Sequence, residues 1–199
     1  MRYKQILLGL ILFVLLGGFL QITGKFHFFY IEQLQLFQFS EDYLADKISS
    51  PGGLSLIIGE FLTQFFITPY AGPFIIAAIL TSIGLTMREI ILQINPNKEL
   101  FLLYLLPVLF LLSIQYDTIA FLFCLISLNA WMRIKDPCYR LSAALVITPL
   151  LFWIGGPIAG LFSLSVVLKE AISRSKQGFY FLAVLIEYLF IGIGSVWST

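Results

Sequence analysis

The feature that most constrains this fold is a series of apolar runs, each about 15 to 20 residues long, that recur along the chain. A hydrocarbon core about 30 Å thick requires a helix of roughly 20 apolar residues to cross it. Hydrophobic residues make up 59% of the 199 residues and charged residues only 12%, about half the charge of an average soluble domain. The sequence therefore predicts an all-α fold, that of a polytopic helical membrane protein.

The apolar runs predict a single integral membrane domain over residues 1–199, with about seven transmembrane helices. A first span is predicted over 5–22, an amphipathic extracytoplasmic segment over 26–68, and a bundle of further spans over 69–197. The first span follows a short basic start and lacks a good cleavage site, which favours an uncleaved signal-anchor helix. Within the bundle, helices are predicted from the break at 69–73 to about residue 87, then over 100–114, 118–134, the divided run 141–168, and 178–197.

The run 141–168 is long for one span, and Gly155-Gly156-Pro157 divides it near its middle. If this run is a hairpin, ten of the twelve Lys and Arg residues lie on the side of the N-terminus. A single span would move three of them to the other side, against the tendency of basic loops to stay in the cytoplasm. We therefore predict a hairpin, with the N-terminus in the cytoplasm and the C-terminus outside.

The segment 26–68 is the one long stretch that mixes many polar groups with many aromatics, so we expect any chemistry or ligand binding there. Ser40 is a good helix N-cap, and Glu41 and Asp42 would occupy the first turn, where negative charge complements the helix dipole. Pro51-Gly52-Gly53 is predicted to end this short helix, and a second amphipathic helix is predicted over residues 54–67 at the membrane surface.

Three acids are candidate catalytic residues: Glu32, Glu41 and Asp42. Carboxylates near a membrane surface can act as general bases when burial or pairing tunes their pKa. Glu32 belongs to a mostly apolar stretch, where a carboxylate needs a partner or a wet cavity. For Glu41 and Asp42 the structural alternative is the stronger one, because a helix N-terminus favours acids without any catalytic role.

Four residues are candidates for ligand binding on the same outer face: Glu60, Gln64, Tyr30 and Asp117. Glu60 and Gln64 lie one turn apart on the polar side of the predicted surface helix. Tyr30 belongs to a group of aromatics that could stack on a sugar ring or a lipid headgroup. The alternatives are a hydrogen bond between Glu60 and Gln64 and an ordinary belt of interfacial aromatics.

Glu187 is the only acid inside a predicted span. A charge in the membrane is costly, so an intramembrane acid is by default a functional hypothesis. The alternative is a protonated or paired carboxyl within the bundle, for which Asn129 is a candidate partner.

The composition also bounds cofactors and partners. The net charge is +1 and no basic stripe with interleaved aromatics occurs, so no nucleic-acid partner is expected. The cysteines, Cys124 and Cys138, are expected to be free thiols, and with a single histidine in the chain no metal site is expected. No cofactor is predicted, although the outer carboxylates leave a divalent cation as a candidate. The lipid bilayer is the predicted partner, and the oligomeric state is left open.

A spaced pattern of three motifs resembles a family of multi-pass inner-membrane proteins of Bacteroides-type bacteria, a domain of unknown function. The motifs are Tyr30-Ile31-Glu32-Gln33-Leu34-Gln35-Leu36-Phe37, Pro51-Gly52-Gly53 and Glu60-Phe61-Leu62-Thr63-Gln64-Phe65-Phe66. The resemblance covers most of the chain and implies a location in the bacterial inner (cytoplasmic) membrane. Members of that family usually run longer, with more helices and a C-terminal extracytoplasmic portion.

A second resemblance, of architecture alone, is to polyprenyl-phosphate-dependent glycosyltransferases of the GT-C type. It implies that Glu32, or the pair Glu41 and Asp42, would be the acidic catalytic residue and that the substrate would be a lipid-linked sugar. The alternatives are a transporter or flippase component that uses Glu187 and Glu60, and a non-catalytic membrane scaffold. An enzyme predicts carboxylates that converge on an outer cavity, whereas a scaffold predicts that Glu60 and Glu32 are bonded by their neighbours.

Overall fold

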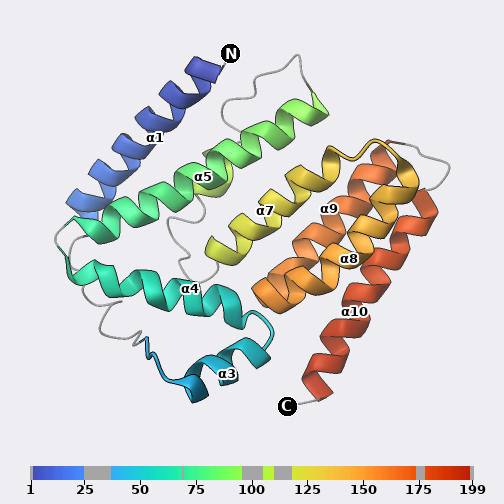
Figure 1. The fold of residues 1–199 in the computed structure, drawn as a ribbon. Coiled ribbons are helices and arrows are strands. Elements are labelled where there is room, and N and C mark those ends of the chain that lie inside the picture. Colours follow the sequence, from blue (N-terminus) through green and yellow to red (C-terminus); the bar gives the residue numbers. More distant parts are fainter. Residues whose placement is uncertain are drawn as a thin grey trace. The chain divides into compact units, whose positions relative to one another are not determined.

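The computed structural model describes residues 2–24, 37–68, 70–95, 105–109, 118–173 and 178–197 (Figure 1). Every regular element in these ranges is helical, as the sequence predicts. The chain divides into two compact units. Unit 1 comprises Met1–Lys47 and Leu56–Ile119, and unit 2 comprises Ile48–Ser55 and Ala120–Thr199.

Unit 1 contains the first long helix, part of the segment between the two long helices, and the second long helix. Its elements are α1 (Arg2–Thr23), most of α3 (Glu41–Ser49), most of α4 (Gly53–Thr63), the 3₁₀ helix η1 (Gln64–Ile67) and α5 (Ala71–Ile94). The boundaries of α3 and α4 agree with the predicted helices of the outer segment within about two residues, except that a 3₁₀ turn replaces the end of the second helix.

Helices α1 and α5 pack against each other in antiparallel directions. Gly17 of α1 faces Phe74 near the start of α5, whereas Leu12 faces Gly84, farther along α5. A Cβ on Gly17 would lie 2.7 Å from the Phe74 ring, so the ring occupies the space that the glycine leaves open. Phe13 adds a second aromatic contact, with its ring centroid 5.6 Å from that of Phe74. Small residues that allow close helix approach are typical of membrane helices.

Unit 2 is a helical bundle built around buried aromatic rings. Its elements are α7 (Thr118–Met132, from Ala120 on), α8 (Pro137–Gly155), the 3₁₀ helix η2 (Gly156–Ile158), α9 (Ala159–Ile172), the 3₁₀ helix η3 (Gly178–Phe181) and α10 (Leu182–Trp197). Trp131 is fully buried and makes edge-to-face contacts with Phe162 and Phe181. These three rings join α7, α9 and η3 in one core.

The predicted break at Gly155-Gly156-Pro157 is confirmed, because α8 ends at Gly155 and α9 begins at Ala159. The side chain of Arg140 near the start of α8 forms an ion pair with Glu170 near the end of α9. Thirty residues of continuous helix would separate these two positions by about 45 Å, so α8 and α9 must fold back on each other. The run therefore forms a helical hairpin.

The end of α5 differs from the prediction. The sequence analysis ended this helix near residue 87 and assigned Arg88 to a polar loop, but α5 continues to Ile94, about two turns farther. A charged side chain does not interrupt the hydrogen bonds of a helix, so Arg88 is accommodated. The helix ends at Asn95, which adopts extended backbone because the next residue is Pro96, and proline disfavours helical backbone in the residue before it.

Three described helical stretches are long and apolar enough to cross a membrane: Ile6–Thr23, Ala71–Ile94 and Pro137–Ile172, the last of which contains both α8 and α9. Shorter apolar helices cover Gly53–Ile67, Thr118–Met132 and Leu182–Ser195. Most of the predicted span 100–114 lies outside the described residues. The number of membrane crossings thus stays a prediction.

Candidate functional site

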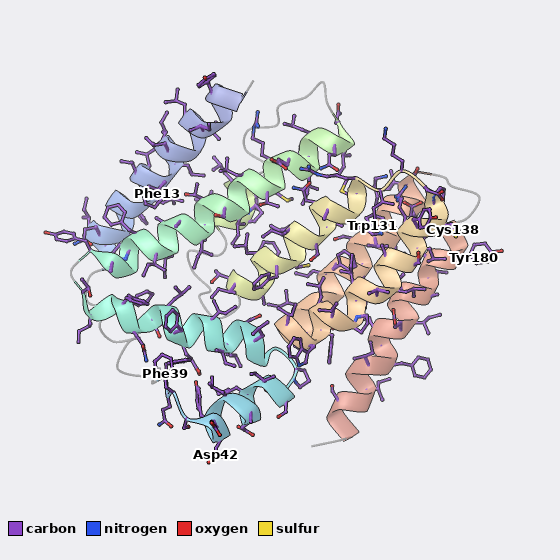
Figure 2. All side chains as sticks on the ribbon, viewed as in Figure 1. Phe13, Phe39, Asp42, Trp131, Cys138 and Tyr180 are labelled. Carbon is purple, nitrogen blue, oxygen red and sulfur yellow. The ribbon has the colours of Figure 1, made fainter. Side chains whose placement is uncertain are left out.

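The first candidate acids lie in the first turn of α3. The Ser40 hydroxyl accepts a hydrogen bond from the backbone N–H of Tyr43, which makes Ser40 the predicted N-cap. Glu41 and Asp42 follow it and are exposed, and Figure 2 shows Asp42 on the helix next to Phe39. Their position complements the helix dipole, which is the structural role that the sequence offered as the alternative to catalysis.

Glu60 on α4 is paired on both carboxylate oxygens. Its Oε1 lies 3.0 Å from the ammonium of Lys47, and its Oε2 accepts a hydrogen bond from the Tyr43 hydroxyl. Lys47 also lies over the Tyr43 ring, 5.6 Å from its centroid. The Glu60 side chain is 15% exposed and that of Lys47 27%, so the pair is partly shielded from water. We call Tyr43, Lys47 and Glu60 the Glu60 cluster.

The electrostatics of this cluster keep the phenol protonated. Burial, the hydrogen bond to Glu60 and the negative charge of Glu60 together raise the pKa of Tyr43 to about 12. Tyr43 is therefore a proton donor at every physiological pH, and Glu60 accepts from two donors. A substrate that approached Glu60 would therefore have to displace an ammonium or a phenol from its oxygens.

The hydrogen bond between Glu60 and Gln64, which the sequence offered as a structural alternative, is not formed. The Gln64 Nε2 instead donates to the backbone carbonyl of Phe37 at 3.2 Å, which ties η1 to the residues that precede α3. Periodicity placed Glu60 and Gln64 on one face correctly, but each finds a nearer partner in another part of unit 1. Both Glu60 oxygens and the Gln64 Nε2 thus have partners within unit 1.

An aromatic cluster lies on the same side of unit 1. The Phe37 ring makes edge-to-face contacts with Phe39, Tyr43 and Phe61, with centroids 4.7, 5.9 and 5.6 Å away. Phe61 in turn contacts Phe65 at 5.4 Å. Phe39 is 78% exposed, and Phe61 and Phe65 are also exposed, so the cluster presents apolar surface beside the acids of α3.

Three candidate site residues, Glu32, Tyr30 and Asp117, lie outside the described residues. The described candidates do not converge on one point: Glu60 is held in its cluster, while Glu41 and Asp42 are exposed on α3. Within the described ranges no group of three or more His, Cys, Asp or Glu residues could hold a metal ion. Cys124 is buried and Cys138 exposed, and both are free thiols, as predicted.

Glu187 lies in α10 and is half-buried. Its Oε2 atom is buried and has no hydrogen-bond partner among the described residues. The suggested pairing with Asn129 is not formed, and the Asn129 side-chain oxygen accepts instead from the Nε of Arg133, one turn farther along the chain. Among the described residues, the Glu187 carboxyl therefore has a buried oxygen that no hydrogen bond compensates.

The sequence analysis missed a buried ion pair in unit 2. The Glu170 residue is 2% exposed and accepts a hydrogen bond from Arg140, whose guanidinium lies 4.7 Å from the centre of the Trp131 ring. The indole N–H of Trp131 donates to the Arg140 carbonyl at 2.8 Å. A usable signal was present: Arg140 and Glu170 are each fifteen positions from Gly155, so a hairpin turning there brings them together.

A second missed feature is the contact between the segment 48–55, where α3 ends and α4 begins, and the C-terminal end of α8, all within unit 2. Gly52 donates its N–H to the carbonyl of Trp153 at 2.9 Å, and the Ser55 hydroxyl donates to the carbonyl of Ile154. The Trp153 indole N–H returns a bond of 2.8 Å to the carbonyl of Ile48. The last carbonyl groups of a helix have no partners within that helix. The segment 48–55 supplies hydrogen-bond donors to two of these carbonyls, those of Trp153 and Ile154.

The described part of the chain is all-helical, and three helical stretches within it have the length and apolarity to span a membrane. A family model with the description "Family of unknown function (DUF6057)" matches residues 2–199, and the chain belongs to that family. No curated protein and no solved structure matches the chain.

Proposed function

We propose that this protein is a multi-pass integral membrane protein of a bacterial inner membrane, with its N-terminus in the cytoplasm, and that it serves as a non-catalytic membrane scaffold. In this proposal the outer segment is a fixed surface element and not a catalytic pocket. The observation that carries the proposal is the Glu60 cluster, in which Lys47 and Tyr43 occupy both oxygens of Glu60.

Two further points support a scaffold over a transferase. Lys47 is one of the few cations predicted on the outer face, and its engagement by Glu60 reduces the charge available to a diphosphate-linked substrate. Glu41 and Asp42 sit where a helix N-terminus favours acids for reasons of stability alone. Glu41, Asp42 and Glu60 thus each have a structural role that accounts for them.

The lipid-linked sugar transferase remains a second candidate, and one observation favours it. Exposed aromatic rings, Phe39 and Phe61 among them, lie in the same small cluster of unit 1 as the start of α3, which carries the exposed carboxylates Glu41 and Asp42. Aromatic faces with neighbouring carboxylates can stack on a sugar ring and accept its hydroxyl hydrogen bonds. In this alternative Glu41 or Asp42, and not Glu60, would carry the chemistry.

Substitutions at Glu60 test the scaffold. We expect Glu60→Leu to lose about 1–3 kcal/mol of stability, because it removes the acceptor of the partly buried Tyr43 hydroxyl and the ion pair with Lys47. Glu60→Gln keeps an acceptor oxygen and the side-chain shape, so it should lose less. Protein abundance in the membrane and complementation of a deletion strain would be measured together. The scaffold predicts that complementation follows abundance for both variants.

The double variant Glu41→Gln with Asp42→Asn is the matched control, since it removes two exposed charges and leaves the Glu60 cluster intact. A scaffold should tolerate this change at nearly normal abundance. Loss of complementation by a Glu60→Gln protein of normal abundance would refute the structural role of Glu60. Loss of complementation by the double variant at normal abundance would favour the transferase.

The proposed topology has its own test. Reporter fusions after Lys98, Arg140 and Lys176 should all report the cytoplasm, and fusions after Lys47 and Thr199 should report the outside. The reason is the distribution of Lys and Arg, which places ten of twelve on the cytoplasmic side. An outside signal at Lys176 would mean that 141–168 crosses once and that six spans, not seven, are present.

A further inference from the structure

One end of unit 2 carries a surplus of positive charge. The C-termini of α7 and α9 and the N-termini of α8 and α10 meet at this end, where Figure 2 shows Trp131, Cys138 and Tyr180 close together. The described basic residues here are Arg133, Lys135, Arg140 and Lys169, and the acidic ones are Asp136 and Glu170. Both acids are engaged: Asp136 caps α8 by accepting from the Cys138 N–H at 2.9 Å, and Glu170 pairs with Arg140.

Lys169 is the cation in this group whose charge is least compensated by its surroundings. It lies half-buried in the last turn of α9 and close enough to Arg140 for the two positive charges to repel. Glu170 compensates Arg140, and Lys169 itself forms no ion pair with any described residue. A partly desolvated ammonium beside another cation is costly, and a bound anion would lower that cost.

The surface around Lys169 is apolar. Leu168 precedes it on α9, and Ile172 follows one turn later on the same side; they are 51% and 80% exposed. Tyr139 and Tyr180 are also exposed at this end of the bundle. An exposed leucine directly before the cation, with further exposed aliphatic and tyrosine side chains at the same end of the bundle, matches a phospholipid, in which a charged phosphate adjoins apolar acyl chains at the membrane interface.

We propose that this end of unit 2 binds the headgroup phosphate of an anionic phospholipid in the inner leaflet, with Lys169 as the contact residue. The exposed Lys135 between α7 and α8 adds attraction toward the anionic surface. The alternative occupant, a free phosphate ion, would not make use of the exposed Leu168 and Ile172. This inference rests on the membrane location proposed above.

The test uses the full-length chain reconstituted in nanodiscs that contain phosphatidylglycerol and phosphatidylcholine. The phospholipids that stay bound after extraction into detergent would be measured by native mass spectrometry. The wild-type chain should retain phosphatidylglycerol in preference to phosphatidylcholine. Lys169→Gln should lower retention of phosphatidylglycerol about fivefold, the effect of one basic residue near an anionic surface. Lys169→Arg should keep it, because the charge is retained.

Lys25→Gln is the matched control, because it removes the same charge from the predicted outer side, and it should leave the lipid ratio unchanged. Equal retention by the wild type and Lys169→Gln would overturn the lipid site, and so would displacement of phosphatidylglycerol by millimolar glycerol phosphate. The lipid ratio does not depend on orientation, so an unexpected reporter topology would refute only the proposed arrangement in the membrane. A wild-type chain that fails to enter nanodiscs would refute the membrane location and the lipid site together.

Discussion

Glu170→Ala is expected to destabilise the protein by about 3–5 kcal/mol, because it removes the carboxylate that compensates a buried guanidinium. Only 14% of the Arg140 side chain is exposed, and its guanidinium is stacked on the fully buried Trp131. Arg140 therefore cannot turn into water without disrupting the aromatic core of unit 2. The free energy of unfolding, measured by denaturant titration in mixed micelles, would show the loss.

The double variant Arg140→Met with Glu170→Leu distinguishes the net contribution of the ion pair from the cost of leaving one charge unpaired. Replacing both charged groups by apolar side chains of similar length removes the desolvation penalty together with the attraction, so most of the stability should return. Lys135→Ala is the control for charge alone, since this exposed side chain should change the stability by no more than about 0.5 kcal/mol. A Glu170→Ala protein as stable as Lys135→Ala would contradict the importance of the ion pair.

The helices could be predicted from the sequence because apolar length and helix breakers are local properties. Ser40 predicted the start of α3, and Gly155-Gly156-Pro157 predicted the turn between α8 and α9. The prediction for α5 was wrong where it took Arg88 as a helix end. Charge marks a preference for water, whereas Pro96 changes the backbone that the preceding residue can adopt, and the backbone effect determined the boundary.

The partners of the candidate acids could not be predicted in the same way. Periodicity assigned Glu60 to a polar face, but the partners on that face come from α3, thirteen and seventeen positions earlier in the chain. The spacing of apolar and polar residues along α4 does not indicate which side of α3 will pack against it. Arg140 and Glu170 are different, since the predicted hairpin already implied their approach by equal spacing from Gly155. Their pairing was missed because charges in the predicted cytoplasmic loops were treated only as signals of topology.

Gly52 and Gly156 form a close backbone contact, which we call the glycine joint, and this contact could not be predicted either. The two glycine motifs are far apart in the sequence, and each was interpreted only as a local break. In unit 2 they meet backbone to backbone: a Cβ on Gly52 would lie 3.2 Å from the Gly156 nitrogen and 3.3 Å from its Cα. Both residues have positive φ, +83° for Gly52 and +60° for Gly156. Gly156 combines this φ with a ψ of −139°, a region that is nearly restricted to glycine.

Gly156→Ala is therefore expected to lose about 1–3 kcal/mol through backbone strain alone. Gly52→Ala should also destabilise the protein, because its Cβ meets backbone atoms that cannot rotate away. Gly192→Ala on α10 is the matched control: apart from its own helix backbone and chain neighbours, nothing described lies within 4 Å of the added methyl group, and alanine favours a helix, so the stability should be unchanged or slightly higher. Thermal unfolding of the three variants in one detergent would rank them. Equal melting temperatures for Gly156→Ala and Gly192→Ala would contradict the joint, since only the first substitution forces a side chain into a backbone conformation that L-residues rarely adopt.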